Sequence, residues 1–155
     1  MTPTNPFDQE PMHYLWEMCI RRDLEAYLVC DWSIIAPDFE PDGFLGINAR
    51  SSNNPCDWKL EFPNLNSYKK AFEQQAGEFA EKEFNGNVRN ILYNSVSLEN
   101  FQLTPSNATL VKVFDGELIE KNSQTTYLKW KSMFYLVRRS DVWKISGFVG
   151  YLPTE

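Results

Sequence analysis

Histidine is almost missing from the sequence, in which His13 is the only imidazole among 155 residues. A metal site built from several histidines, or a pH switch built from paired histidines, is therefore excluded. Cysteine is scarce as well: Cys19, Cys30 and Cys56 form an odd number without CxxC spacing, which argues against a disulfide framework and a structural zinc site. We therefore expect no metal, no cofactor, and a reducing, cytoplasmic compartment.

Long hydrophobic runs and clusters of positive charge are missing too. No stretch approaches the roughly 20 apolar residues of a membrane span, and residues 1–11 lack the basic and apolar regions of a secretion signal. The net charge of -6 repels phosphate backbones, and lysine and arginine occur only singly or in short pairs. We therefore expect neither nucleic acid nor a membrane as a partner.

Common catalytic and metal-binding motifs are absent or incomplete. The sequence contains no GxSxG, P-loop or GxGxxG motif, so it gives no support for a hydrolase, an NTPase or a dinucleotide enzyme. Residues 38–43 imitate the start of an EF-hand loop, but Ala49 stands where the bidentate glutamate should be, and Pro41 stiffens the loop. An acidic turn between a helix and a strand is the better interpretation.

Apolar residues, in contrast, are plentiful. They make up 43% of the chain, and aromatic residues alone make up 15%, which is ample for a core or a pocket. The length suits one core and is short for two typical domains. We therefore expect a single domain over residues 1–155, with residues 1–7 as a flexible tail.

The hydrophobic pattern predicts helices first and strands later. A first helix is expected from about Asp8 to Ile35, a short strand near residues 44–47, and a second helix from Asn64 or Asn66 to about Phe84. Period-two alternation then predicts four long strands between Val88 and Leu152. Turns are expected at residues 104–107 and 140–141, and a turn or bulge at 115–116. This order favours an α+β fold with an antiparallel sheet.

Several segments carry a family resemblance through their order and spacing. Residues 27–32 (YLVCDW), 35–39 and 42–44 resemble the opening of SnoaL-like proteins in the NTF2-like superfamily, and residues 142–145 (VWKI) resemble the closing strand. The resemblance covers most of the chain. It implies an α+β cone, in which N-terminal helices pack in a strongly curved antiparallel or mixed sheet. It also implies an apolar pocket at the open end and a homodimer formed through the sheet.

The ketosteroid isomerases on this fold use an aspartate base with a tyrosine and a protonated carboxylic acid as donors. Without gaps, and with the family's helical aspartate matched to Asp31, the base position falls near Ile47 or Asn48 and the tyrosine position near Asp23. The third position falls near Ser132 and Met133. None of these residues supplies the required group, so the isomerase triad is absent.

A different SnoaL-like enzyme remains as an alternative. A cyclase, isomerase or dehydratase of this branch would use Asp31 or Asp42 as a base and Tyr27 as a donor. A third hypothesis is a protein-interaction module whose exposed sheet engages a partner.

Aromatic residues near the expected mouth of the cone are the candidates for ligand binding, although filling the core is the commoner role of such residues. On the long strand expected over residues 127–138, the face with Leu128, Trp130, Phe134 and Leu136 is expected to point inward. Our leading hypothesis is a domain that holds a small, largely apolar molecule. The candidate ligand-binding residues are Trp16, Tyr27, Trp32, Asn48, Trp58, Trp130 and Phe134.

Overall fold

The N-terminal helix begins after Pro11 and passes through a π-helical segment. Its three parts are α1 (Met12–Trp16), the π-helical η1 (Glu17–Arg22) and α2 (Asp23–Leu28). The helix is therefore shorter at both ends than the expected span of residues 8–35. It ends near Cys30, whose φ of 56° is left-handed and cannot continue a right-handed helix. The 3-10 turns η2 (Trp32–Ile34) and η3 (Ala36–Asp38) follow.

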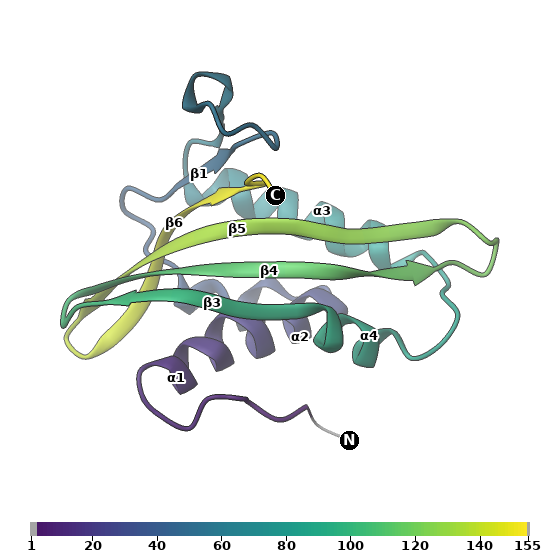
Figure 1. Ribbon diagram of the computed structural model, residues 1–155, viewed down its shortest axis with the longest axis horizontal. Helices are drawn as coiled ribbons and strands as arrows, with labels where there is room; N and C mark the ends of the chain where they lie inside the picture. Colours follow the sequence, from purple (N-terminus) through teal and green to yellow (C-terminus); the bar gives the residue numbers. More distant parts are fainter. Residues whose placement is uncertain (1–2, 155) are drawn as a thin grey trace.

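The segment before this helix lies against the rest of the fold. The structure, a computed structural model, describes residues 3–154 (Figure 1), so residues 1 and 2 of the predicted tail lie outside the described residues. The Pro3 carbonyl accepts a hydrogen bond from Arg21 at 2.7 Å, and Asn5 donates to the His13 carbonyl at 2.9 Å. The ring of Phe7 packs edge-on against Phe101. These contacts tie residues 3–7 to the fold.

Two further helices are fixed by asparagine caps. Asn64 accepts a hydrogen bond from the Ser67 backbone at the start of α3 (Leu65–Ala80), as expected, although α3 ends four residues before Phe84. Asn87 caps α4 (Val88–Ser95) in the same way. The prediction of strand from residue 88 was wrong, because the cap and the apolar spacing of Val88, Ile91 and Leu92 favour a helix there.

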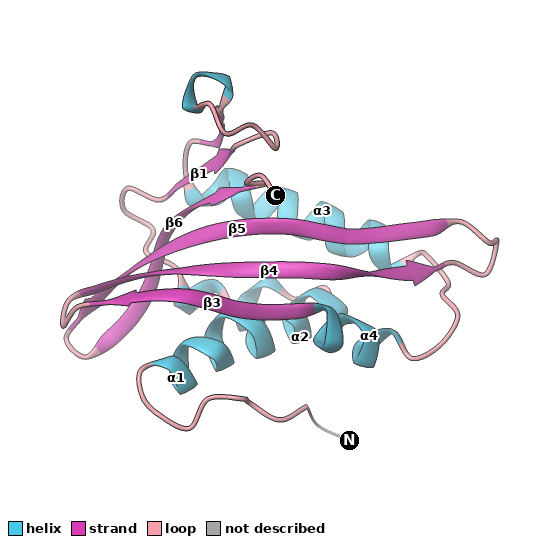
Figure 2. Cartoon of the chain, in the orientation of Figure 1, coloured by secondary structure: helices cyan, strands magenta, loops and turns pink. Residues whose placement is uncertain are grey.

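Six strands form one mixed sheet in the order β2-β1-β6-β5-β4-β3 (Figure 2). Only β1 and β6 pair in parallel. The strands are β1 (Leu45–Asn48), β2 (Lys59–Phe62), β3 (Val96–Leu103), β4 (Asn107–Ile119), β5 (Thr125–Arg139) and β6 (Val142–Gly150). The four expected strands after residue 88 are therefore present, and β1 and β2 form a short arm joined through the 3-10 turn η4 (Pro55–Asp57).

The expected irregularity at residues 115–116 is a different feature. Gly116 lies within the regular β4–β5 ladder opposite Leu128, so the prediction of a turn or bulge was wrong. A Cβ atom at Gly116 would collide with the side chain of Ser95, at the end of α4. The glycine therefore serves the close approach of α4 to the sheet.

The helices cover one face of the curved sheet and leave the other face bare. Figure 1 shows β3, β4 and β5 crossing in front, with α1, α2 and α3 behind them. On β5, Leu128 and Leu136 are buried on the helix side, as the alternation of the sequence predicted. Within residues 3–154, no helix combines the length and the apolar character that crossing a membrane requires.

Candidate functional site

A cavity of about 400 Å³ lies between the helices and the concave face of the sheet. This volume falls in the range of pockets that hold small molecules. One side is formed by η1, α2 and α3, and the other by the inward residues of β4, β5 and β6. The cavity is therefore the space that the cone encloses.

Aromatic rings make up much of the cavity wall. On the sheet side, Phe114 and Trp130 stack with ring centroids 4.5 Å apart, and the ring centroids of Phe134 and Phe148 are 5.7 Å apart. On the helix side, Phe72 of α3 contributes a further ring. Such walls favour flat, apolar molecules, which gain from both desolvation and ring contacts.

The floor of the cavity holds a buried lysine. The ammonium group of Lys112 donates to the Cys19 carbonyl at 2.6 Å and to the Asp23 carboxylate at 2.8 Å, and only 6% of Lys112 is exposed. Cys19 belongs to the π-helical segment η1, a type of helix irregularity that often occurs at functional sites. The rings of Phe114 and Phe134 flank the ammonium group at 5.4 and 6.0 Å.

A second ion pair borders the same floor. Arg22 binds Asp38 through two hydrogen bonds, Nη2 to Oδ1 at 2.7 Å and Nε to Oδ2 at 3.0 Å. These bonds raise the pKa of the Arg22 guanidinium, which stays charged. Both carboxylate oxygens of Asp38, the first residue of the EF-hand-like sequence, thus accept hydrogen bonds from an arginine. Across residues 3–154 no cluster of three or more histidine, cysteine, aspartate or glutamate side chains could hold a metal ion.

Two weakly acidic groups on the cavity wall are held in their neutral forms by burial. Burial raises the pKa of the Cys19 thiol from 9.0 to about 12, so this thiol is not a nucleophile near neutral pH. Burial also raises the pKa of the Tyr68 hydroxyl. That hydroxyl forms no hydrogen bond within the described part of the chain, so it is free to contact a molecule in the cavity.

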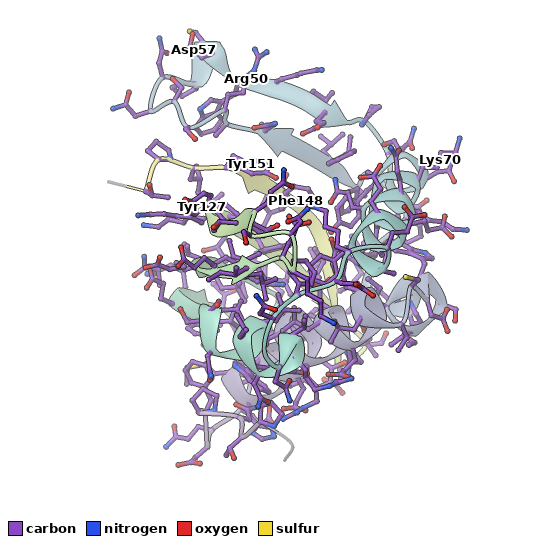
Figure 3. The ribbon with its side chains drawn as sticks, turned by 90° about the vertical axis from the view of Figure 1, so that its right-hand side faces the viewer. Arg50, Asp57, Lys70, Tyr127, Phe148 and Tyr151 are labelled. Atoms are coloured by element: carbon purple, nitrogen blue, oxygen red, sulfur yellow. The ribbon has the colours of Figure 1, made fainter. Side chains whose placement is uncertain are left out.

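The mouth of the cavity carries polar and aromatic side chains. Tyr27 donates a hydrogen bond to the Gln75 carbonyl at 3.3 Å, and burial raises the pKa of its hydroxyl to about 12. Tyr127 and Tyr151 are well exposed, and Tyr151 lies 6.3 Å from Trp130. In Figure 3, Tyr127, Phe148 and Tyr151 lie below the β1–β2 arm, the tip of which carries Arg50 and Asp57.

Three of the predicted ligand-binding residues line the cavity: Tyr27, Trp130 and Phe134. Trp32 is packed into the adjacent core, where it stacks on Phe39 with ring centroids 5.3 Å apart. Trp16 is buried against Tyr93, away from the cavity lining.

The other predicted residues lie on the β1–β2 arm or in exposed turns. Asn48 donates to Glu61 at 3.1 Å, and Trp58 donates to the Ser52 carbonyl at 2.8 Å. Of the three catalytic candidates, Asp31 and Asp42 are exposed and outside the cavity lining, whereas Tyr27 lines the cavity. Asp31 caps η2 by accepting from the backbone and hydroxyl of Ser33.

The polar residues of the floor were missed in the sequence. One signal was available: along β4 the inward positions Leu110, Phe114 and Leu118 are apolar, and Lys112 interrupts this alternation. A charged residue at such a position must find a partner inside the protein. Its partner Asp23 is 89 residues away, so the sequence does not identify it.

Comparisons with known proteins identify the fold of this chain through similar solved structures. No protein-family model and no curated protein matches the sequence. An NTF2-like protein of unknown function from Shewanella oneidensis is similar in structure, with a TM-score of 0.58 and 13% identity over 90% of this chain and 98% of that one. An NTF2-like superfamily protein from Salmonella enterica serovar Typhimurium has a TM-score of 0.57 and 14% identity over 92% and 90% of the two chains.

A third similar structure comes from Xanthomonas campestris and is described as a putative calcium/calmodulin-dependent protein kinase II association domain. Its TM-score is 0.55 and its identity 17%, over 99% of this chain and 95% of that one. All three likenesses extend over nearly the whole of both chains. The predicted α+β cone is confirmed: the chain has an NTF2-like fold with an open, mixed six-stranded sheet.

Proposed function

We propose that this domain is a SnoaL-like member of the NTF2-like superfamily that binds one small, largely apolar molecule in the cavity of its cone. The observation that carries the proposal is the cavity of about 400 Å³ with walls of stacked aromatic rings. A module that used only its outer sheet would have no need to keep this interior space open. The SnoaL-like assignment rests on the segments at residues 27–44 and 142–145.

The positions and ion pairs of the aspartate side chains favour binding without catalysis over a SnoaL-like enzyme. Asp31 and Asp42 lie outside the cavity, and Asp23 and Asp38 are held in ion pairs with Lys112 and Arg22. The other two lining carboxylates, Glu61 and Glu78, are exposed and accept hydrogen bonds from Asn48 and Gln74. A general base needs a carboxylate that is free to take a proton from the substrate.

A cavity-blocking substitution tests the proposal. Ala71 lies on α3 and lines the cavity, so Ala71→Phe would fill part of the space that a ligand needs. Ala80→Phe on the same helix is the matched control, because Ala80 is exposed and does not line the cavity. We expect 2-ethylnaphthalene, measured by equilibrium dialysis, to bind the unmodified protein and Ala80→Phe, and to bind Ala71→Phe at least about tenfold more weakly. Equal binding by all three proteins would place the probe outside the cavity.

Self-association through the sheet is a second proposal. The bare face of the sheet carries Val111, Val113 and Met133, all partly exposed, and Val111 lies directly opposite Met133 in the ladder. One of the similar structures is described as an association domain. We propose that a second copy of this chain covers the patch, and that Val113→Glu reduces the native mass from dimer to monomer. A monomeric unmodified protein would contradict this.

A further inference from the structure

Two hydrogen-bond donors stand side by side on the cavity floor. Lys112 of β4 and Ser132 of β5 are direct partners in the antiparallel ladder, and both line the cavity. Side chains directly opposite each other in such a ladder have Cβ atoms about 4.5–5.5 Å apart. The two side chains therefore leave neighbouring points of the sheet, and both reach the cavity.

Both groups have unused hydrogen-bonding capacity. A lysine ammonium has three N–H donors, and Lys112 uses two of them, on the Cys19 carbonyl and on Asp23. The Ser132 hydroxyl forms no hydrogen bond among residues 3–154, although only 9% of this residue is exposed. No buried side-chain polar atom of the described chain lacks a partner, so the Ser132 hydroxyl oxygen faces the open cavity, where a ligand can accept its hydrogen bond.

A glycine lies beside the Ser132 hydroxyl. Gly150, at the end of β6, lines the cavity, and a Cβ atom there would lie 3.5 Å from the Ser132 hydroxyl oxygen. The ring of Phe134, 6.0 Å from the Lys112 ammonium, closes another side.

The charge of the lining selects against an anion. The lining includes two lysines, Lys82 and Lys112, and four carboxylates, Asp23, Asp38, Glu61 and Glu78. Lys112 is already neutralised by Asp23, so a second carboxylate at the floor would lie next to Asp23 without a cation of its own. A neutral acceptor meets no such cost.

We infer that Lys112 and Ser132 form a subsite for the carbonyl oxygen of a neutral, largely aromatic ligand, such as an aryl ketone. The oxygen accepts one hydrogen bond from the ammonium group and one from the hydroxyl, and the apolar body of the ligand lies between the aromatic walls. This inference rests on the proposed binding function and adds the chemical class of the ligand.

Two matched probes test the subsite. 2-Acetylnaphthalene carries a ketone, and 2-ethylnaphthalene has nearly the same shape without one. Equilibrium dialysis gives the affinity of each protein for each probe, and the measured quantity is the ratio of the two affinities. The two probes differ in hydrophobicity, but this difference is the same for every variant, so a change in the ratio between variants reports the polar contact. We expect this ratio, ketone over hydrocarbon, to fall about tenfold in Lys112→Met, as expected for the loss of a hydrogen bond to a charged group. In Ser132→Ala we expect a fall of about threefold.

Lys129→Met is the control, because Lys129 is an exposed lysine on the outer face of β5, the strand that carries Ser132. The ratio of ketone to hydrocarbon affinity should be unchanged in this variant. Unchanged binding of 2-ethylnaphthalene to a variant shows that it is folded, and Ser132→Ala serves alone if Lys112→Met does not fold. A ratio that stays constant in the floor variants while the hydrocarbon binds would overturn the subsite and leave the proposed function intact. Tighter binding of 2-naphthoate than of the ketone would overturn the neutral class. No binding of any probe would overturn both proposals.

Discussion

Two ion pairs hold the charged residues of the cavity floor, and their energetics differ from those of surface pairs. In each pair one partner is almost fully buried: Lys112 with Asp23, and Asp38 with Arg22. Breaking such a pair leaves a charge with little access to water, which costs far more than the loss of an exposed pair. The two ion pairs therefore contribute to the stability of the fold.

Removal of Arg22 tests this at Asp38. We expect Arg22→Met to lower the free energy of unfolding by about 3 kcal/mol, measured by urea denaturation, because Asp38 loses both of its charged hydrogen bonds. Arg50→Met is the control, because Arg50 is exposed at the tip of the arm and forms no ion pair in the described chain; it should change stability by less than about 0.5 kcal/mol. Equal effects of the two substitutions would show that the Arg22 pair contributes little.

The three cysteines should differ sharply in reactivity. Cys19 is buried and its pKa is raised by burial, whereas Cys30 and Cys56 are exposed. Titration with DTNB at pH 8 is expected to modify Cys30 and Cys56 in the folded protein, and to reach Cys19 only in urea. Rapid reaction of Cys19 without denaturant would contradict the closed packing of η1 against the floor.

Burial of Cys19 also predicts an alkaline limit to stability. Its pKa is raised on folding from 9.0 to about 12, so the folded state holds the thiol proton more tightly than the unfolded state does. This contribution is complete below pH 9.0 and is lost as the pH rises toward 12, by about 1.4 kcal/mol per pH unit. Urea denaturation at pH 8, 10 and 11 should show a shallower decline in Cys19→Ala than in the unmodified protein. Parallel declines would assign the alkaline loss to other groups.

At the scale of elements, the asparagine cap of α4 explains why this segment is helical. Val88, Ile91 and Leu92 have helical spacing, but three apolar residues in so short a segment do not exclude a strand. The Asn87 cap favours the helix, and the exposed ion pair of Arg89 with Glu25 of α2 adds a smaller contribution. The contact with α2 joins residues 64 positions apart, so the sequence pattern did not contain this part of the explanation.

We expect Asn87→Ala to cost about 1 kcal/mol in the free energy of unfolding, because the cap hydrogen bond to the Asn90 backbone is lost. The control is Asn90→Ala, which keeps that backbone donor and removes only an exposed side chain; it should be neutral within about 0.5 kcal/mol. A neutral Asn87→Ala would mean that tertiary contacts alone set the start of α4.

Strand alternation predicted much of the sheet and little of the floor. The inward face of β5 follows directly from period two, since successive side chains point to opposite faces. The parallel pairing of β1 with β6 joins segments about 100 residues apart and has no local signal. Lys112 and Asp23 are likewise far apart in the sequence, so their pairing has no local signal either. The aromatic wall was therefore partly predictable, and the polar floor was not.

At the scale of the whole molecule, the two faces of one curved sheet differ. Its concave face and the helices enclose the cavity, and its convex face, on which we propose that a second copy binds, is not covered by helices (Figure 1). The order of helices and strands and the family resemblance together predicted this architecture. The cavity's chemistry depends on side chains that the fold brings together from η1, β4 and β5, and only the structure shows their arrangement.

The most direct test of the central claim is native mass spectrometry of the unmodified protein and of Ala71→Phe, each incubated with an organic extract of the cells that make the protein. We expect the unmodified protein to retain one molecule of defined mass per chain, and Ala71→Phe to retain none, because its cavity is blocked. An unmodified chain that retains nothing, or an equal added mass on both proteins, would contradict a ligand-binding cone.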